Sequence, residues 1–199
     1  MEANLNLIEA LKSSQYITAS QQSFTHYDVF IDDEVGEPAS YRELITTLFN
    51  AGENDTMAIY LNSPGGNLDS ALAIIEGLKN TQARVTGVII GACHSAASLI
   101  SMYCHEVAVM DNAYSLVHTA SFGSSGNTSN VKSHTEFTVK MVESVLNETY
   151  EGFLSKEELA KVKQGVELWF DAESIRKRFE SRVKHLEAEL KKKNKGDKK

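Results

Sequence analysis

The sequence predicts an α/β fold with a mostly parallel β-sheet. Two stretches, Met57 to Leu78 and Val85 to His105, each contain a short apolar run, a turn of small residues and then apolar residues at helical spacing. Units that repeat strand, turn and helix in this way form right-handed crossovers, which align the strands in parallel. Because the ends of parallel strands meet at one edge of the sheet, we expect the functional residues there.

Shorter segments extend this pattern on both sides. Tyr27 to Ile31 is expected to form a strand, and Pro38 marks the start of a helix whose apolar side chains share one face. Further short strands are expected at Val107 to Met110 and at Tyr114 to Val117. These segments would complete the sheet around the two repeated units.

The C-terminal half of the chain is expected to be mostly helical. Ser121 to Asn130 is polar and rich in glycine, which indicates a flexible loop or an edge ribbon. A long helix is expected over Val131 to Gly152, and Ser155 opens a capping box for a shorter one. Gly165 to Phe170 is a compact apolar run, after which Asp171 starts a helix that leads into a basic tail.

Length and composition indicate one globular domain. The chain has 199 residues, of which 42% are hydrophobic. We divide it into an N-terminal arm at 1–24, a main domain at 25–183 and a basic tail at 184–199 that is expected to be disordered. No apolar run is long enough to cross a membrane, and the first residues lack the pattern of a signal peptide. Cys93 and Cys104 lie in apolar surroundings, so we expect reduced core thiols in a cytoplasmic protein.

The charges are unevenly distributed. The segment from Ile175 to Lys199 has 11 Lys or Arg residues against 4 Asp or Glu residues, whereas the whole chain has a net charge of −7. The preceding body therefore has a net charge about twice as negative as that of the whole chain. An acidic body argues against nucleic acid as the main ligand.

The most distinctive motif is Asn62 to Gly66, with the sequence Asn-Ser-Pro-Gly-Gly, at the end of an expected strand. Pro64 followed by two glycines fixes a tight turn and leaves backbone N–H groups uncovered by side chains. Such a sequence is most often only a turn. Its functional interpretation is an oxyanion hole, which needs N–H donors directed at a developing negative oxygen.

A second distinctive stretch, Gly91 to Leu99, connects a strand to a helix. A serine at such a junction can be exposed beside free backbone N–H groups, and we take Ser98 as the candidate nucleophile. Ser95 is assigned to the turn itself and is not preferred. The competing interpretation is that the serine only caps the helix.

A nucleophilic serine needs a base to take its proton. His118 ends the next expected strand, where a parallel neighbour would place it beside Ser98. His94 and His105 are closer in sequence, but residues that flank a helix start rarely reach back over the same hydroxyl. His118 is therefore the candidate base.

The base in turn needs an orienting acid. Glu167 lies within an apolar run beside Trp169, and a partly buried carboxylate there needs a hydrogen-bond partner such as an imidazole N–H. Asp171 is the competing acid, but its position suits the N-cap of the last helix. Glu167 is therefore the candidate third member.

The motif Asn62 to Gly66, the segment Ser95 to Ser98 and the strand ending in His118 together resemble the proteolytic subunit of Clp protease, the ClpP family. The similarity covers roughly Asp28 to Phe179. The shortened form is more similar to the ClpP-like head maturation (prohead) proteases of tailed bacteriophages, in which a segment resembling Trp169 to Ala172 follows the acid.

The resemblance implies a ClpP/crotonase-type fold of repeated ββα units and a serine endopeptidase that acts on polypeptides without a cofactor or metal ion. It assigns Ser98 as nucleophile, His118 as general base and Glu167 as the acid, where the family has Asp. The backbone N–H groups of Gly66 and Leu99 match the oxyanion hole.

The resemblance also implies an assembly. Residues 121–153 correspond to the family's handle, a glycine-rich substrate-binding ribbon and a long helix through which rings pair. A homo-oligomeric ring, stacked on a second ring, is therefore expected. The sequence has no ATP-binding loop of the Walker type, so any unfolding activity would come from a separate ATPase of the AAA+ class.

Two other hypotheses remain. A crotonase-like enzyme would use the same oxyanion hole for an acyl-CoA enolate, but it needs acids near that site and basic residues for the CoA phosphates. A ring-forming structural or adaptor protein that has lost catalysis is the other alternative, and Glu167 in place of Asp is the one feature that suggests it.

Overall fold

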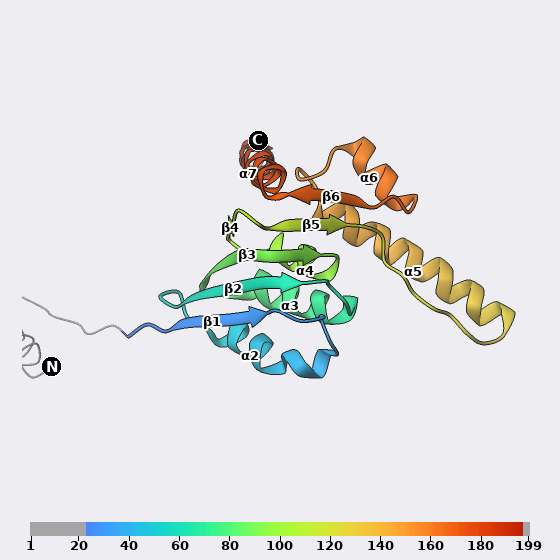
Figure 1. The fold of residues 1–199 in the computed structure, drawn as a ribbon, viewed down its shortest axis with the longest axis horizontal. Coiled ribbons are helices and arrows are strands. Elements are labelled where there is room, and N and C mark those ends of the chain that lie inside the picture. Colours follow the sequence, from blue (N-terminus) through green and yellow to red (C-terminus); the bar gives the residue numbers. More distant parts are fainter. Residues whose placement is uncertain (1–22, 197–199) are drawn as a thin grey trace, which may run out of the picture.

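The computed structural model describes residues 23–196, which form a layered α/β domain (Figure 1). Except for its last two residues, the N-terminal arm predicted at 1–24 lies outside this range. In the described part, six strands form one sheet in the order β1-β2-β3-β5-β6, with β4 paired to β3 as well. The strands are β1 (His26–Ile31), β2 (Thr56–Ser63), β3 (Arg84–His94), β4 (Glu106–Val109), β5 (Tyr114–Val117) and β6 (Leu168–Asp171).

The sheet is mostly parallel. β1, β2 and β3 run parallel to one another, and both β4 and β5 pair in parallel with β3. β6 pairs with β5 in the antiparallel sense and closes that edge of the sheet. The predicted α/β fold with a mostly parallel sheet is confirmed.

Some helices cover one face of the sheet, and others lie beyond the edge that β6 forms. The short helix η1 (Pro38–Tyr41), α2 (Arg42–Asn50), α3 (Leu68–Asn80) and α4 (Ala96–Ser101) lie together on one face (Figure 1). The long helix α5 (Thr128–Thr149) projects away from the sheet, and α6 (Lys156–Lys163) and α7 (Ala172–Gly196) follow near β6. No helix within residues 23–196 is long and apolar enough to span a bilayer.

The core lies between the sheet and these helices. In β2, Met57, Ile59 and Leu61 stand at every second position and therefore share one face of the sheet, and all three are almost fully buried. Ile74 of α3 and Leu48 of α2 meet them from the helical layer, and both are inaccessible to solvent. Burial of this apolar surface provides the main driving force for the fold.

A buried arginine connects the C-terminal helix to α5. Arg182 of α7 donates hydrogen bonds to the carbonyl oxygens of Thr149 and Glu151, each at 2.6 Å, at the end of α5. Cations stabilise the carboxyl end of a helix, where carbonyl groups lack intrahelical partners. This contact fixes the end of α5 that lies nearest the sheet.

The structure differs from the sequence prediction at three places. Gly91 to His94, expected in a turn, continue β3, which is 11 residues long. The next helix, expected to reach His105, ends at Ser101. The long helix α5 begins at Thr128 rather than Val131, and the glycine-rich stretch before it forms a loop, one of its two expected forms.

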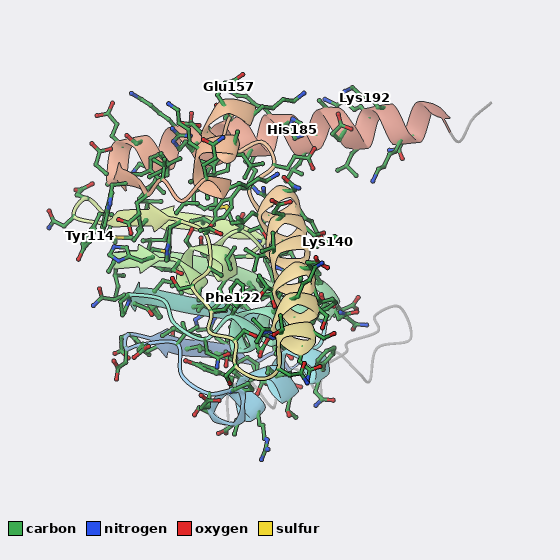
Figure 2. All side chains as sticks on the ribbon, turned by 90° about the vertical axis from the view of Figure 1, so that its right-hand side faces the viewer. Tyr114, Phe122, Lys140, Glu157, His185 and Lys192 are labelled. Atoms are coloured by element: carbon green, nitrogen blue, oxygen red, sulfur yellow. The ribbon has the colours of Figure 1, made fainter. Side chains whose placement is uncertain are left out.

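The tail is the other difference. Residues 184–196, expected to be disordered, continue α7 as a helix, and Figure 2 shows this helix with Lys192 extending beyond the body. The segment contains good helix formers, and Lys192 pairs with Glu189 one turn away, as Lys177 pairs with Glu173 earlier in α7. Local propensity and charge pairing explain the helix.

Candidate active site

A cavity of about 850 Å³ lies where the carboxyl ends of β2, β3 and β5 face α5. In Figure 2, α5 passes in front of the sheet, with Phe122 on its sheet side and Lys140 on its other side. One wall is apolar and comes mostly from α5, and the opposite wall is the backbone of two turns. The lining residues are Glu34, Pro64, Gly65, Gly66, Asn67, Leu68, Asp69, Ser95, Ala96, Leu99, His118, Ala120, Ser121, Phe122, His134, Phe137, Thr138, Met141, Val142, Val145, Leu146 and Tyr150.

Ser95 occupies the junction between β3 and α4 and lines this cavity. Its φ of 51° is the one positive φ of a non-glycine residue within residues 23–196. Its N–H donates to the carbonyl of Leu116 at 2.9 Å, and its carbonyl accepts from Leu99 at 3.0 Å. A strained serine at a strand-to-helix turn is the geometry that exposes a nucleophilic hydroxyl.

The Pro-Gly-Gly turn packs directly against this junction. A Cβ on Gly65 would lie 2.6 Å from the carbonyl oxygen of His94 and 2.7 Å from Cβ of Ser95. Gly65 and Gly66 also have φ values of 90° and 145°, which L side chains rarely adopt. Both positions need glycine, because an L side chain would strain the backbone and would collide with the atoms packed against the turn.

Two backbone N–H groups, one in this turn and one at the start of α4, remain available to a ligand. Val35 donates to Gly65 O and Asn67 donates to Val35 O, both at 2.7 Å, and these two bonds leave the N–H of Gly66 unused among residues 23–196. Ala96 is the first residue of α4, where N–H groups have no intrahelical acceptor. Gly66 and Ala96 both line the cavity, so their N–H groups are suited to an oxyanion.

The expected role of Leu99 in the oxyanion hole is wrong. Its N–H donates to the carbonyl of Ser95 as the first bond of α4 and is therefore not free. Leu99 lines the cavity, but it does not offer a backbone donor there. The available donor is Ala96, which directly follows Ser95.

The expected exposure of Ser98 is also wrong. Ser98 has no solvent-accessible surface, and its hydroxyl forms a 2.8 Å hydrogen bond with the hydroxyl of Tyr150. Ser98 does not line the cavity, whereas Ser95 does. Because β3 continues to His94, the junction lies at Ser95 and Ser98 falls in the first turn of α4, on the side that faces the core.

His118 follows β5 and lines the cavity, as expected for a residue at a strand end. β5 lies parallel to β3 with His94 opposite Leu116, which places the residues after each strand side by side. Ser95 and His118 are therefore brought to the same edge of the sheet. The hydrogen bonds recorded for residues 23–196 do not include a direct one between them, and such bonds are often long in the absence of substrate.

Glu167 immediately precedes β6, on the other side of His118. The antiparallel register pairs Val117 with Leu168, so the next pair in the same register is His118 with Glu167. Opposite residues in such a pair direct their side chains to the same face. Glu167 is exposed, however, so the expectation of a partly buried acid is wrong.

The competing acid has the structural role that its position suggested. Oδ1 of Asp171 accepts the N–H of Ser174 at 2.8 Å and caps α7, and this hydrogen bonding lowers the pKa of Asp171. The N-cap interpretation is confirmed.

His94 and Cys93 are packing residues. The imidazole of His94 packs edge-on against Tyr114 and Trp169, with ring centroids 4.9 and 5.2 Å away. Burial and the nearby His118 lower the pKa of His94, which favours its neutral form. Burial raises the pKa of the free Cys93 thiol to about 12, and Cys104 is also a free thiol.

Ser95 and Ala96, which the structure places on the cavity, were not among the candidate residues predicted from the sequence. The local pattern that could have identified them is Ser-Ala-Ala directly after an apolar strand, because small residues allow the turn to approach the glycines. The apolar wall on α5, with Phe137, Met141 and Val145, was expected only in general terms as part of a handle.

The model of the Clp protease family matches residues 12–175, which include the Pro-Gly-Gly turn, Ser95, His118 and Glu167. The match covers most of the chain and agrees with the mixed, mostly parallel sheet described above. The chain belongs to the Clp protease family.

Proposed function

We propose that this chain is a serine peptidase of the Clp type in which Ser95, rather than Ser98, is the nucleophile. The observation that supports this choice is the position of Ser95 on the cavity, with a positive φ, between Gly65 and the end of β5. Ser98 is buried and its hydroxyl is bonded to Tyr150. A substrate carbonyl can reach Ser95 without any rearrangement of the core.

The reaction follows from these positions. His118 accepts the proton of the Ser95 hydroxyl as Oγ attacks the carbonyl carbon of the scissile peptide. The N–H groups of Gly66 and Ala96 donate to the oxyanion that forms. The tetrahedral intermediate collapses when the C–N bond breaks and His118 protonates the leaving amine. Water, deprotonated by His118, then hydrolyses the ester on Ser95 and regenerates the hydroxyl.

Glu167 is proposed as the acid that orients His118. The register of β5 and β6 supports this assignment, since it places the two residues opposite each other. A glutamate is one methylene longer than an aspartate, which lets an exposed residue reach back toward the imidazole. Asp171 is engaged at the start of α7 and is not available for this role.

The assembly is also part of the proposal. We infer a homo-oligomeric ring, which the uncovered face of the sheet supports. Phe30 and Tyr60 stack there with centroids 4.6 Å apart, Phe30 is 60% exposed and Trp169 is 58% exposed. Exposed aromatic groups of this kind are typical of interaction surfaces. Stacking of rings and a separate AAA+ ATPase remain inferences from the resemblance.

The biological setting that we propose is cytoplasmic cleavage of polypeptides. Maturation of a phage head, with a capsid or scaffold protein as substrate, is the specific form that the segment Trp169 to Ala172 favours. Degradation assisted by an ATPase is the other form. The alternative from a different class, a ring-forming structural homologue without catalysis, is favoured by Glu167 in place of the family's Asp and by the exposure of this side chain.

A fluorophosphonate probe tests the proposal, because it forms a covalent bond only with an activated serine. We expect the wild-type chain and Ser98→Ala to be labelled and Ser95→Ala to remain unlabelled, with the modified peptide mapping to Ser95. Cleavage of an unfolded protein should follow the same order. Circular dichroism confirms that each variant is folded. Labelling at another serine would overturn the assignment, and a folded wild-type chain that neither reacts nor cleaves would favour the structural alternative.

A further inference from the structure

The cavity that contains Ser95 has an acidic rim. Glu34 and Asp69 both line it, and no Lys or Arg is present among its lining residues. Both carboxylates are exposed, and neither forms an ion pair within residues 23–196. The rim therefore presents two carboxylates that the described chain does not neutralise.

The position of Glu34 relates this rim to the scissile bond. Its Cγ lies 2.9 Å from the point that a Cβ on Gly66 would occupy, so the side chain lies directly beside the residue whose N–H is proposed to hold the oxyanion. Asp69 lies in the first turn of α3, shortly after Gly66. Because Glu34 and Asp69 line the same cavity as Gly66, a peptide bound with its carbonyl at Gly66 would bring the residues next to the cleaved bond, spaced about 3.3 Å apart along an extended chain, to this rim.

The opposite wall has a different character. Phe137, Met141 and Val145 of α5 supply apolar surface across the cavity from the rim. A substrate segment that fits both walls has an apolar side chain on one side and a cationic one on the other. The acidic loop that precedes Glu34, with Asp32 and Asp33, extends the negative potential beyond the cavity.

We propose that Glu34 and Asp69 are specificity residues that select polypeptide segments with a Lys or Arg within two residues of the cleaved bond, next to an apolar side chain. This inference rests on the proposed function, since it concerns the substrate of the same site. The two carboxylates attract a cationic side chain and repel an acidic one, so discrimination comes from both effects. The acidic groups border the cavity of the nucleophile and are not an isolated surface patch.

Three fluorogenic peptides test the proposal. They share one length and one apolar residue at the cleaved bond, and they differ only in a neighbouring residue, which is Lys, Gln or Glu. For the wild-type chain we expect kcat/KM to fall in that order, by about 5-fold at each step in low salt, and the spread to narrow in 0.5 M salt. In Glu34→Gln/Asp69→Asn the three values should come within about 2-fold of each other.

The matched control is Glu53→Gln, which removes an exposed carboxylate in the turn after α2, away from the cavity. It should retain the wild-type order of peptides. Equal kcat/KM values for the three peptides in the wild-type chain would overturn the proposal, and so would a wild-type preference in the double variant. Cleavage that does not depend on Ser95 would instead contradict the proposed function.

A binding measurement keeps the inference testable without turnover. Folded Ser95→Ala is titrated with the same peptides, labelled for fluorescence anisotropy. The Lys peptide should bind about 5-fold more tightly than the Gln peptide, and adding Glu34→Gln/Asp69→Asn should remove the difference. Equal dissociation constants for the Lys and Glu peptides would overturn the inference even if no peptide is cleaved.

Discussion

The junction between β3 and α4 and the first turn of α4 contain the same type of side chain in opposite surroundings. Ser95 at the junction is partly exposed, has a φ of 51° and lies on the cavity. Ser98 in the helix has no exposed surface and shares a hydrogen bond with Tyr150. The first environment leaves the Ser95 hydroxyl available at the expense of backbone strain. The second uses the Ser98 hydroxyl as the hydrogen-bond partner of the buried Tyr150 hydroxyl.

Several independent contacts hold Ser95 in its strained backbone conformation. Its N–H and its carbonyl are both hydrogen-bonded, to Leu116 and Leu99 respectively. Gly65 packs against its Cβ from the other side. A residue in an unfavourable φ region costs about 1–3 kcal/mol, which these contacts offset. Changes at the junction should therefore affect activity, and changes at Ser98 should affect stability.

The largest effect is expected for Gly65→Ala. The added methyl would lie 2.6 Å from a backbone oxygen and 2.7 Å from Cβ of Ser95, so the junction must shift. A displacement of about 1 Å at a reacting group can lower the rate about 10²-fold, and we expect kcat/KM for peptide cleavage to fall by at least that factor. Gly52→Ala, in the turn after α2, is the control and should cleave normally. Normal cleavage by a folded Gly65→Ala chain would show that the glycine turn does not contribute to peptide cleavage.

A smaller effect is expected for Glu167→Gln, which tests the third member of the proposed triad. The substitution keeps the shape of the side chain and removes the charge that is proposed to orient His118. Because Glu167 is exposed, we expect kcat to fall by about 10- to 100-fold with little change in KM, less than for a buried triad acid. Glu187→Gln on α7 is the matched exposed control. An unchanged kcat would reduce the proposed triad to Ser95 and His118.

The strands and helices could be predicted from the sequence because their apolar periodicity is local information. The position of the junction could not. Gly91 and Ala92 are weak strand formers, but the N–H of Ala92 donates to Oδ1 of Asn62 at 3.0 Å, and this contact with the neighbouring strand holds them in the sheet. The extension of β3 moves the helix start and makes Ser95 the junction residue.

The environment of the acid was mispredicted for a related reason. Glu167 lies in an apolar run, and such runs are usually buried. β6 is an edge strand with one covered face, so Phe170 is buried whereas Trp169 is 58% exposed. Only the pairing of β6 with β5, which joins distant parts of the chain, shows where Glu167 lies. The position of the proposed base, by contrast, was predictable because His118 directly follows a strand.

Stability rather than activity should change in Ser98→Ala. Removal of the hydroxyl leaves the buried Tyr150 hydroxyl without its partner, and an unsatisfied buried group costs about 1–3 kcal/mol. Urea denaturation should show this loss, while the folded variant should cleave peptides at the wild-type rate. Adding Tyr150→Phe should cost less than the sum of the single changes, because no polar group is then left unpaired. Loss of cleavage in folded Ser98→Ala would contradict the proposal that Ser95 serves activity and Ser98 serves stability.

The smallest effect is expected for His94, the last residue of β3 directly before the junction, and it depends on pH. Burial and the nearby His118 lower its pKa below the usual 6.5 in the folded chain, so between these two pKa values the unfolded chain binds more protons than the folded one. Stability contributed by neutral His94 is therefore fully present above pH 6.5 and is lost as pH falls toward the folded pKa. Urea denaturation at pH 7.5, 6.5 and 5.5 should show a smaller acid-induced loss in His94→Gln than in the wild-type chain. His94 packs against Tyr114 and Trp169 beside the junction. An equal or larger acid-induced loss of stability in the variant would mean that protonation of His94 does not weaken this packing.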